Sequence, residues 1–423
     1  MLDIKFIREN QDTLKQALKD RNFKLDLDGL LRLDDSRRKI LCELEALRAE
    51  KNKANDQISA LLKEKKEAKE KIASMKGISE EIDGLEKKLK VSAAELEKML
   101  FSVPNIPHPS VPRGDASHNK VVRSWGEPPE FDFKPLTHIE LSQRLDIIDF
   151  ARAAKISGSN FVLYKGLGAR LERALINFML DLHTAKHGYS EVFPPFLVNR
   201  ASMTGTGQLP KLEEDMYRLK DDDLFLIPTA EVPVTNIFRD EILEEKQLPV
   251  YYTAYTACFR REAGSYGKDT KGLNRVHQFD KVELVKFVKP QSSYDELEKL
   301  VNDAEEVLQV LGLPYRVVML ASGDLSFAAS KCYDLEAYAA GSDKWLEVSS
   351  CSNFEDFQAR RANIKFRGAT TAKGAQYVHT LNGSGIALAR TVIALLENYQ
   401  QKDGSVLIPQ ALLPYLGGKE RIA

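Results

Sequence analysis

Two runs of apolar residues, spaced alternately three and four positions apart, constrain the N-terminal part of the chain more than any other feature of the sequence. They span residues 33–61 and 78–99, and only Arg37, Lys51 and Ser92 interrupt them with polar side chains. Such spacing is the heptad seam of a coiled coil, in which apolar positions recur about every 3.5 residues. The sequence therefore predicts two long helices that bury these stripes.

The segment between the two runs offers a place for the chain to reverse. Residues 63–71 interleave lysine with glutamate and carry no seam, and Ser74 and Gly77 follow. We therefore predict an antiparallel hairpin, whose arms of about 30 residues would project roughly 45 Å. The alternative for the two seams is a coiled coil that dimerises the protein. The lysines near the turn fit a solvated helix face equally well.

A proline-rich segment at residues 103–115 separates this helical region from the rest of the chain, because proline cannot continue a helix. The chain of 423 residues also exceeds the usual size of one domain, about 100–200 residues. We predict two domains, at residues 1–102 and 103–423. In the second, short β-like runs alternate with helices without βαβ regularity, which predicts an α+β fold with an antiparallel or mixed sheet flanked by helices.

The composition limits the class of protein and the kind of partner. With 43% hydrophobic and 29% charged residues, the chain has the composition of a soluble globular protein. Its longest apolar runs are shorter than the roughly 20 residues that cross a bilayer, and the N-terminus lacks the apolar core of a signal peptide. We expect a cytoplasmic protein with no membrane partner. The net charge of −1 means that any contact with nucleic acid must use local basic patches.

The cysteines give no support for a metal site. They lie far apart and form no CxxC pair, the spacing typical of structural zinc sites, at Cys42, Cys258, Cys332 and Cys351. We therefore expect no zinc.

A helix is predicted at residues 168–182, with its apolar side chains on one face, followed by Gly188, a short strand and two prolines at 194–195. The helix carries no reactive groups. Its apolar face predicts packing against the core, with a subunit interface as the alternative.

Residues 252–288 read as a strand, a glycine-rich loop and a second strand, and they hold the most informative side chains. Alternate residues of a strand share a face, which predicts that Arg275, Phe279 and Glu283 lie together, as do Arg260 and Glu262 on the preceding strand. Guanidinium groups bind phosphates, an aromatic ring stacks on a purine, and a carboxylate binds an ammonium or a hydroxyl. The alternative is an exposed sheet face laced with salt bridges.

Residues 379–390 lead from a strand through glycines into an apolar helix that runs to Glu397. The free N–H groups and dipole of a helix N-terminus favour anions, and Arg390 adds a full positive charge there. This pattern alone favours Ser384 as the N-cap of the helix rather than as a ligand.

These segments together resemble the three signature motifs of class II aminoacyl-tRNA synthetases. Phe-Arg-Arg-Glu at 259–262 with Arg-x-His-Gln-Phe at 275–279 resembles the second motif, and Gly-Ser-Gly-Ile-Ala-Leu-Ala-Arg at 383–390 the third. The helix before Gly188 and the Pro-Pro strand resemble the first. Pro-Thr-Ala-Glu at 228–231, Glu-Val-Ser-Ser at 347–350 and Leu-Asn-Gly-Ser-Gly at 381–385 are similar to the bacterial-type seryl-tRNA synthetase family. The resemblance covers nearly the whole chain, including the hairpin.

The resemblance implies the activity and the partners. Members of that family activate serine with ATP to seryl adenylate and transfer it to the 3′ end of tRNA(Ser), with tRNA(Sec) as a further acceptor by resemblance only. The hairpin would reach the long variable arm of the tRNA, and the protein would be a homodimer with the first motif at its interface. Magnesium would accompany ATP, and no separate editing domain is expected.

The resemblance also implies roles for individual residues. Serine would be bound by Thr229, Ala230, Glu231, Glu283, Asn382 and Ser384. ATP would be bound by Arg260, Arg261, Glu262, Arg275, Phe279, Glu347, Val348, Ser349, Ser350 and Arg390. Of these, Arg260 and Arg390 would be catalytic, and Glu347 and Ser350 would ligate Mg²⁺. Residues three apart do not share a strand face, so the strand must end or bend near Ser349.

Three competing functions are weighed against features of the sequence. A relative that loads a carrier protein instead of tRNA would lack the long hairpin. A non-catalytic paralogue would have lost some of the candidate ATP and serine residues, and all are present. A zinc-dependent branch would need metal ligands that the cysteine spacing does not offer.

Overall fold

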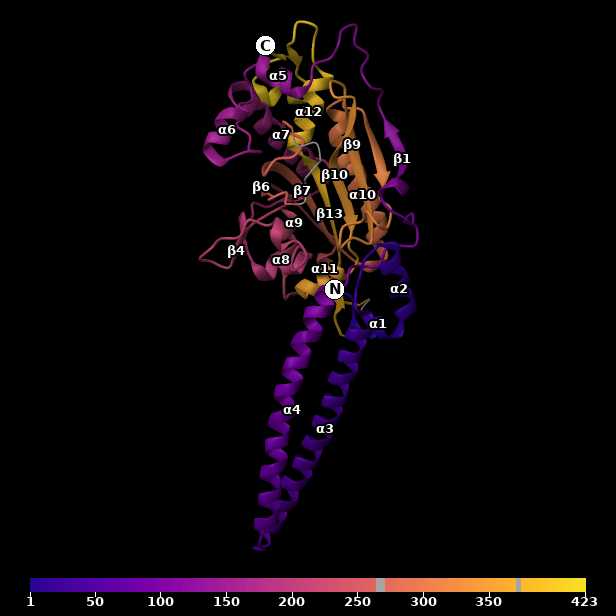
Figure 1. The fold of residues 1–423 in the computed structure, drawn as a ribbon, viewed down its shortest axis with the longest axis vertical. Helices are drawn as coiled ribbons and strands as arrows, with labels where there is room; N and C mark the ends of the chain where they lie inside the picture. The colour runs from indigo at the N-terminus through magenta and orange to yellow at the C-terminus, as the bar shows by residue number, and fades with distance from the viewer. Residues whose placement is uncertain (264–270, 370–373) are drawn as a thin grey trace. The chain divides into compact units, whose positions relative to one another are not determined.

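The computed structural model describes residues 1–263, 271–369 and 374–423, and it divides into two compact units. One unit comprises residues 2–18 and 23–104, and the other comprises Met1 with residues 19–22 and 105–423. Figure 1 shows the elements of each, and each unit is described by itself. The predicted glycine-rich loop falls largely on residues 264–270, outside the described residues.

The first unit is a helical hairpin, as predicted. Two short helices, α1 (Ile4–Glu9) and α2 (Gln11–Asp20), precede the long helices α3 (Leu27–Lys63) and α4 (Lys69–Phe101). The chain reverses over residues 64–68, so the second helix begins earlier than its apolar seam. Within the lysine-rich segment, residues 64–68 form the predicted reversal, and the chain is helical from Lys69 onward.

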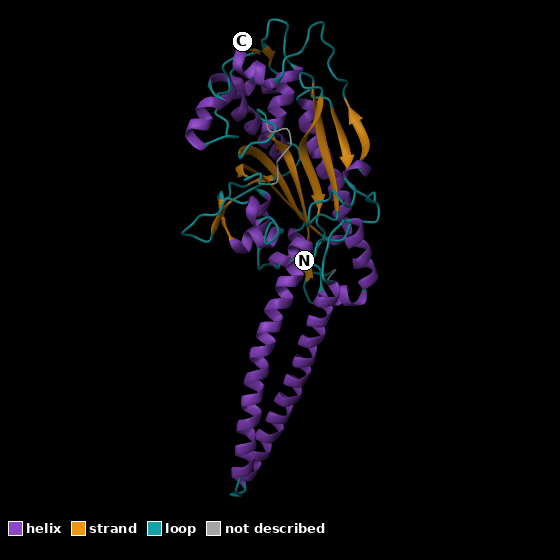
Figure 2. Cartoon of the chain, in the orientation of Figure 1, coloured by secondary structure: helices purple, strands orange, loops and turns teal. Residues whose placement is uncertain are grey.

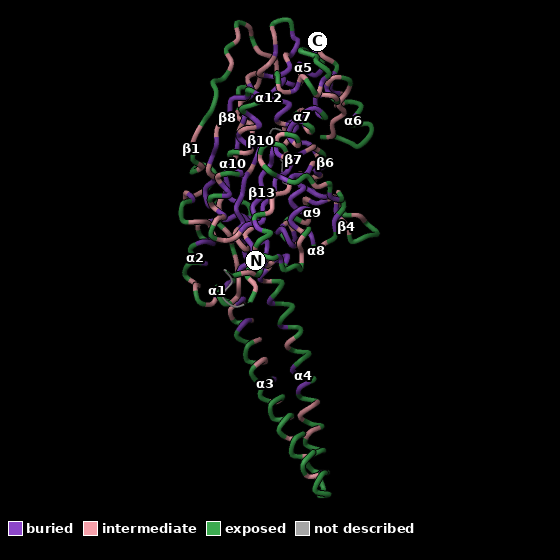
Figure 3. The backbone as a smooth tube through the Cα atoms, turned by 180° about the vertical axis from the view of Figure 1, so that it is seen from behind, coloured by how far each residue is buried: buried purple, intermediate pink, exposed green. Residues whose placement is uncertain are grey.

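The heptad seam closes within the hairpin. Every predicted seam position is buried or half-buried, while the other faces of both helices are mostly exposed (Figure 3). Leu44, Ile82 and Leu85 form the centre of the contact, and four more seam residues pack around them, namely Ile40, Leu47, Ile78 and Leu89. The prediction of an antiparallel hairpin from periodicity alone is confirmed, because the two stripes cover each other.

Two of the polar residues in the seam, Arg37 and Ser92, differ in whether their side chains find a hydrogen-bond partner. Arg37 donates to Asp34 at 3.4 Å, and Arg8 donates to the same carboxylate at 2.7 Å, so the buried Asp34 is paired twice. Ser92 is buried, and its hydroxyl has no hydrogen-bond partner in the described part of the chain.

We predict that Leu44→Ala opens the hairpin locally. Truncating a buried leucine costs about 2–5 kcal/mol, so amide hydrogen exchange over residues 40–50 should become faster by roughly 1.5 to 3.5 orders of magnitude. Exchange measured by mass spectrometry on the full-length protein checks this, with Glu45→Ala, an exposed position on the same helix, as the matched control. Equal exchange in both variants would contradict the assigned seam.

The second unit is built on an eight-stranded sheet with the strand order β1-β8-β9-β10-β13-β7-β6-β2. All neighbouring strands pair antiparallel except β2 with β6, which confirms the α+β prediction. The strands are β1 (Lys120–Trp125), β2 (Ser190–Glu191), β6 (Val250–Phe259), β7 (Gln278–Val288), β8 (Tyr315–Met319), β9 (Lys331–Ala339), β10 (Lys344–Asn353) and β13 (His379–Ala387).

Three helices cover one face of this sheet: α7 (Gly166–Ala185), α10 (Ser293–Val310) and α12 (Leu388–Asn398) (Figure 2). Strand β7 shows why the faces differ, because its side chains alternate. Val282 and Leu284 enter the core shared with the helices, whereas Lys281 and Glu283 point to the other face. The apolar face of α7 lies in that core, as one of the two predictions for it required.

Shorter elements surround the opposite face and leave part of it open. A small core of α11 (Phe357–Ala362), α9 (Glu231–Thr235) and the C-terminal half of β7 covers one end. The remaining elements are α5 (His138–Arg144), α6 (Phe150–Ser157), α8 (Arg200–Thr206), β3 (Leu197–Asn199), β4 (Leu224–Leu226), β5 (Ile242–Glu244), β11 (Lys365–Arg367), β12 (Gln376–Tyr377), β14 (Val406–Leu407) and β15 (Arg421–Ile422). Among the described residues, no helix has the length and apolar character to span a membrane.

Candidate active site

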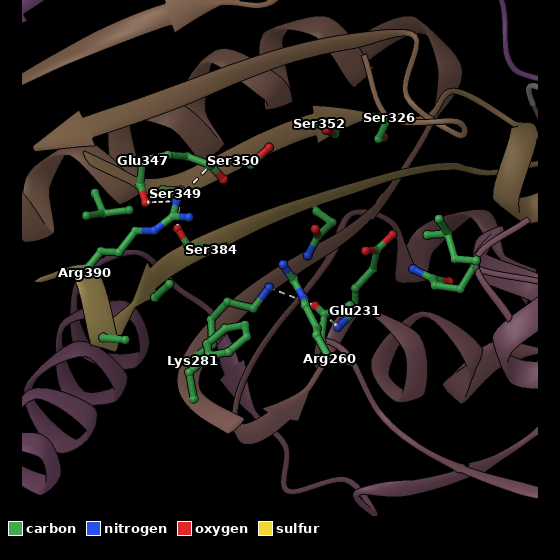
Figure 4. Close-up of a pocket in the computed structure, with 18 of the residues that line it drawn as sticks. Glu231, Arg260, Lys281, Ser326, Glu347, Ser349, Ser350, Ser352, Ser384 and Arg390 are labelled. Carbon is green, nitrogen blue, oxygen red and sulfur yellow. Dashed lines mark hydrogen bonds and ion pairs between the residues drawn. The ribbon is translucent and has the colours of Figure 1, made fainter. Parts of the chain in front are cut away.

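A cavity of about 390 Å³ opens on the sheet face that the three helices leave uncovered. Thirteen of the sixteen predicted site residues line it: Thr229, Glu231, Arg260, Glu262, Arg275, Phe279, Glu347, Val348, Ser349, Ser350, Asn382, Ser384 and Arg390. Arg390 and Glu347 lie at one end of the cavity and Glu231 at the other (Figure 4). Ala230, Arg261 and Glu283 are not among the described residues that line it.

The prediction that three of the charged residues lie on strands is wrong. Strand β6 ends at Phe259 and β7 begins only at Gln278, so Arg260, Glu262 and Arg275 lie on the chain between them. Glu262 has a positive φ of 52°, which a regular strand cannot contain. Two of them are nevertheless in contact: the Arg275 guanidinium donates to the Glu262 carboxylate at 2.7 Å. Phe279 and Glu283 share one face of β7, as predicted.

Backbone contacts continue the pairing beyond the strand ends and hold Arg260 in place. The Arg260 amide donates to the carbonyl of His277 at 2.9 Å, and the imidazole Nδ1 of His277 donates to the carbonyl of Arg260 at 2.9 Å. The Arg260 guanidinium lies 5.1 Å from the centre of the Phe279 ring and donates to the carbonyl of Pro228. Arg261 points elsewhere, since its guanidinium donates to the carbonyl of Glu214 at 3.1 Å.

Strand β10 has the irregularity that the sequence required. The register of its pairing with β9 shifts between Glu347 and Ser349, so a bulge brings Glu347 and Ser350 to the same cavity. Arg390, in the first turn of α12, donates to the carbonyl of Glu347 at 2.8 Å and lies 3.4 Å from its carboxylate. A cation and two oxygen donors therefore converge at this end.

Ser384 is not a helix cap. Strand β13 continues through the glycines to Ala387, and the helix begins at Leu388 without a side-chain cap. Glycines without side chains fit here because Cβ atoms at Gly383 or Gly385 would lie within 3 Å of neighbouring side chains. The glycines before a helix favoured Ser384 as an N-cap, but close packing is the physical reason for these glycines. Ser384 and Asn382 therefore lie on one strand and face the cavity.

The floor of the cavity is a buried hydrogen-bonded cluster around Glu283. Its carboxylate accepts from the Thr229 hydroxyl at 2.6 Å and from the Asn382 amide at 2.8 Å, and the Lys281 ammonium lies 2.5 Å from it. Lys281 also donates to the Thr229 hydroxyl at 3.0 Å. Glu283 is only 1% exposed, so it supports the residues that line the cavity.

Glu231 is a second buried carboxylate beside this cluster. It accepts from Gln358 at 2.6 Å, and the other end of the Gln358 amide accepts from Thr380 at 2.8 Å. Burial raises the pKa of Glu231 to about 7, and the negative charge of Glu283 adds to the effect. The carboxyl of Glu231 thus titrates near neutral pH, which is common among functional carboxyls.

Two residues of this site, Lys281 and Gln358, were missed by sequence reasoning. Lys281 lies two positions before Glu283 on the same strand, so the alternation that placed Phe279 and Glu283 on one face also applies to it. Gln358 comes from α11, far away in sequence, and no local pattern marks it. Its buried amide becomes significant only when the fold brings it to Glu231.

Comparisons with known proteins cover the whole chain. A family model described as the seryl-tRNA synthetase N-terminal domain matches residues 1–107, and one described as the tRNA synthetase class II core domain (G, H, P, S and T) matches residues 214–399. The serine–tRNA ligase of Thermodesulfovibrio yellowstonii is 58% identical over 421 residues, which are 99% of each chain. That of Caldanaerobacter subterraneus is 59% identical over 417 residues, or 98% of each.

The chain belongs to the seryl-tRNA synthetase family. Solved structures of the family agree with its fold. The seryl-tRNA synthetase of Pyrococcus horikoshii complexed with ATP has a TM-score of 0.93 at 40% identity, over 100% of this chain and 99% of that one. The cytoplasmic serine–tRNA ligase of Naegleria fowleri in complex with AMP has a TM-score of 0.88 at 30% identity, over 100% and 98%.

We predict that Glu231 lowers the stability of this family member as pH rises. Its folded pKa, about 7, exceeds the ordinary value of 4.5, so the folded chain keeps a proton that the unfolded chain releases between these values. Stability is therefore lost from about pH 4.5 to about pH 7.

Glu231→Gln keeps an acceptor for Gln358 and removes this titration. The variant should melt a few degrees higher than the parent at pH 8, and at nearly the same temperature at pH 5. Thermal unfolding at both pH values checks this, with the exposed Glu241→Gln as control. A stability difference that does not change with pH would contradict it.

Proposed function

We propose that this protein is a serine–tRNA ligase that activates serine with ATP to seryl adenylate and transfers it to the 3′ end of tRNA(Ser). The observation that carries the proposal is one cavity in which cations and an aromatic ring lie beside a buried carboxylate and several hydroxyls. The first set suits ATP and the second suits a small amino acid. The identity of 58% to a full-length relative named serine–tRNA ligase supports it. By family resemblance, tRNA(Sec) is a further acceptor.

The proposed ATP site uses the ring of Phe279 to stack on adenine and the cations around it to hold the phosphates. Arg260 would bind the α-phosphate, and Arg275 and Arg390 the terminal phosphates. Glu262 would contact the adenine, and the set is completed by Arg261, Val348 and Ser349. The ion pairs of Arg275 with Glu262 and of Arg390 with Glu347 support this, because they orient both guanidinium groups in the cavity.

Magnesium would be held by Glu347 and Ser350. Carboxylate and hydroxyl oxygens suit a hard cation, and the bulge in β10 turns both side chains to the cavity. The bound ion would supply positive charge to phosphate oxygens. No zinc is proposed.

The proposed serine site is the polar end of the cavity. Thr229, Glu231, Asn382 and Ser384 would contact the amino acid, with Ala230 in the same loop and Glu283 bracing Thr229 and Asn382 from below. A site built to hydrogen-bond a hydroxyl rejects alanine, because its own buried polar groups would be left without partners. A close wall would reject the extra methyl of threonine.

The proposed chemistry needs no nucleophilic side chain. A carboxylate oxygen of serine attacks the α-phosphorus of ATP, the bond to the bridging oxygen breaks, and pyrophosphate leaves. The 3′-terminal hydroxyl of tRNA then attacks the seryl carbonyl, AMP leaves, and the hydroxyl proton is released. Arg260 and Arg390, the two catalytic residues, would act by orienting the phosphates and stabilising the charge that develops on them.

The two compact units suggest a division of labour between two domains. We propose that residues 1–102 form the tRNA-binding domain and residues 103–423 the catalytic domain, which is supported by the compact unit that ends at Pro104. The enzyme would act in the cytoplasm as a homodimer, with α7 and the strand after it at the interface.

Pyrophosphate exchange across a panel of amino acids tests the proposed function. We expect exchange with serine and far less with alanine or threonine, and Arg260→Ala should lower kcat by about 10²–10³, as the loss of an oxyanion donor does. Arg316→Ala is the matched control, because that arginine pairs with Glu336 outside the cavity. Exchange with another amino acid in place of serine would overturn the proposal, and a kcat within twofold would make Arg260 structural.

The hairpin should be needed for tRNA and not for activation. Replacing residues 33–99 by a short Gly/Ser linker removes a seam that is buried within itself, so serine-dependent exchange should survive. Charging of tRNA(Ser) should fall severely, and the dependence of tRNA affinity on salt should flatten, because binding uses lysine and arginine against phosphate. Charging equal to that of the parent would show that the hairpin does not bind tRNA.

A further inference from the structure

Strand β13 leaves the regular sheet beside the proposed serine site. Ser384 pairs with Glu283 on β7, but the next paired residue, Ala387, is opposite Lys281. The residues at 385 and 386 thus oppose a single residue of β7, which is a β-bulge. Backbone groups that leave a ladder in a buried region must find other partners, or they cost the free energy of a lost hydrogen bond.

Side chains satisfy the backbone groups around this bulge. The Ser349 hydroxyl donates to the carbonyl of Ser384 at 2.6 Å. The His183 imidazole Nε2 lies 2.9 Å from the carbonyl of Gly385, and the amide of Ile386 donates to the Met179 sulfur at 3.4 Å. His183 and Met179 both come from α7, one turn apart, so this helix supports the bulge from the core side.

The protonation of His183 follows from its two neighbours. A carbonyl can only accept, so Nε2 of His183 carries the hydrogen and donates to Gly385. Its Nδ1 then accepts from the Nδ1 of His187, at 2.9 Å. Burial lowers the pKa of His183 to about 4, so the ring is neutral at physiological pH, as this arrangement requires. His187 in turn lies 3.0 Å from the carboxylate of Glu306, which fixes its ring.

His183 packs so closely against Gly385 that the bulge has no room for a side chain at this position. A Cβ atom built on Gly385 would lie 2.5 Å from the His183 Nε2 and 3.0 Å from a carbon of Leu284. His183 is fully buried, so the ring cannot swing away into solvent. The backbone at Gly385 is therefore held from one side by the imidazole and from the other by the sheet.

We propose that His183 is a positioning residue for the serine site, which holds Ser384 and Asn382 against Glu283 through the carbonyl of Gly385. The inference rests on the proposed function, which assigns those two side chains to serine. His183 is outside the cavity lining and would touch no substrate. Its effect is confined to the amino acid because Arg390, beyond the bulge, is held separately by the carbonyls of Glu347 and Asn274.

Two variants that differ by one methylene separate positioning from packing. His183→Gln can place an amide N–H where Nε2 was and keep the bond to Gly385. His183→Asn is too short for that bond and reaches only the position of Nδ1. We expect His183→Asn to raise KM for serine about tenfold with KM for ATP within twofold, because a buried carbonyl loses its donor. His183→Gln should restore KM for serine to within about threefold of the parent.

Serine-dependent pyrophosphate exchange gives both constants. Thr184→Val is the matched control on the same helix, since among the described residues its hydroxyl bonds only to carbonyls of α7. Equal KM for serine in the Asn and Gln variants, or parallel increases in both KM values, would overturn the inference. If His183→Asn does not fold, His183→Leu, which has similar volume and no donor, gives the same comparison with Gln. A parent without serine-dependent exchange would refute the proposed function instead.

Discussion

A buried cluster of two carboxylates and one lysine, formed where helix α9 meets the sheet, constrains the rest of the catalytic unit. Glu283 lies close enough to Glu231 that its negative charge raises the pKa of Glu231, and the buried Lys281 ammonium lies 2.5 Å from the Glu283 carboxylate. Such groups cost several kcal/mol each in a low-dielectric region unless hydrogen bonds and opposite charges compensate. Thr229, Asn382 and Gln358 supply those bonds from three different elements. The loop, strand and helix must therefore be in place together before the cluster is stable.

The site depends on departures from regular sheet structure. A regular strand repeats every two residues, so it cannot turn Glu347 and Ser350 to the same side. A regular ladder also cannot place two residues of β13 opposite one residue of β7, as happens between Ser384 and Ala387, just before the helix that carries Arg390. Bulges in β10 and β13 provide both departures. A hydrogen bond joins them, in which the Ser349 hydroxyl of β10 donates to the Ser384 carbonyl of β13 at 2.6 Å.

The parts of the molecule that could be predicted are those governed by local periodicity. The heptad seam specified the hairpin, alternation placed Phe279 and Glu283 on one face, and the spacing of Glu347 and Ser350 required a bend. The errors arose where tertiary contacts override local pattern. Arg260 and Arg275 followed a strand-like sequence but lie beyond the strand ends, and Ser384 had the sequence context of a helix cap but continues a strand, because neighbouring side chains pack against the glycines. Gln358 shows the limit most clearly, since its role depends on a contact across 127 positions.

The same buried cluster links serine binding to protons. At neutral pH a carboxyl with a pKa of about 7 is ionised in only about half of the molecules. In the proposed complex Glu231 would contact serine, and an ammonium beside it would favour its ionised form, so binding would release the remaining proton. The site is thus matched to a substrate that brings its own positive charge, because the ammonium relieves a repulsion between two carboxylates that Lys281 alone does not remove. A neutral molecule of the same shape would leave that repulsion in place, so the electrostatics of the proposed serine site favour a cationic amino group over a neutral one.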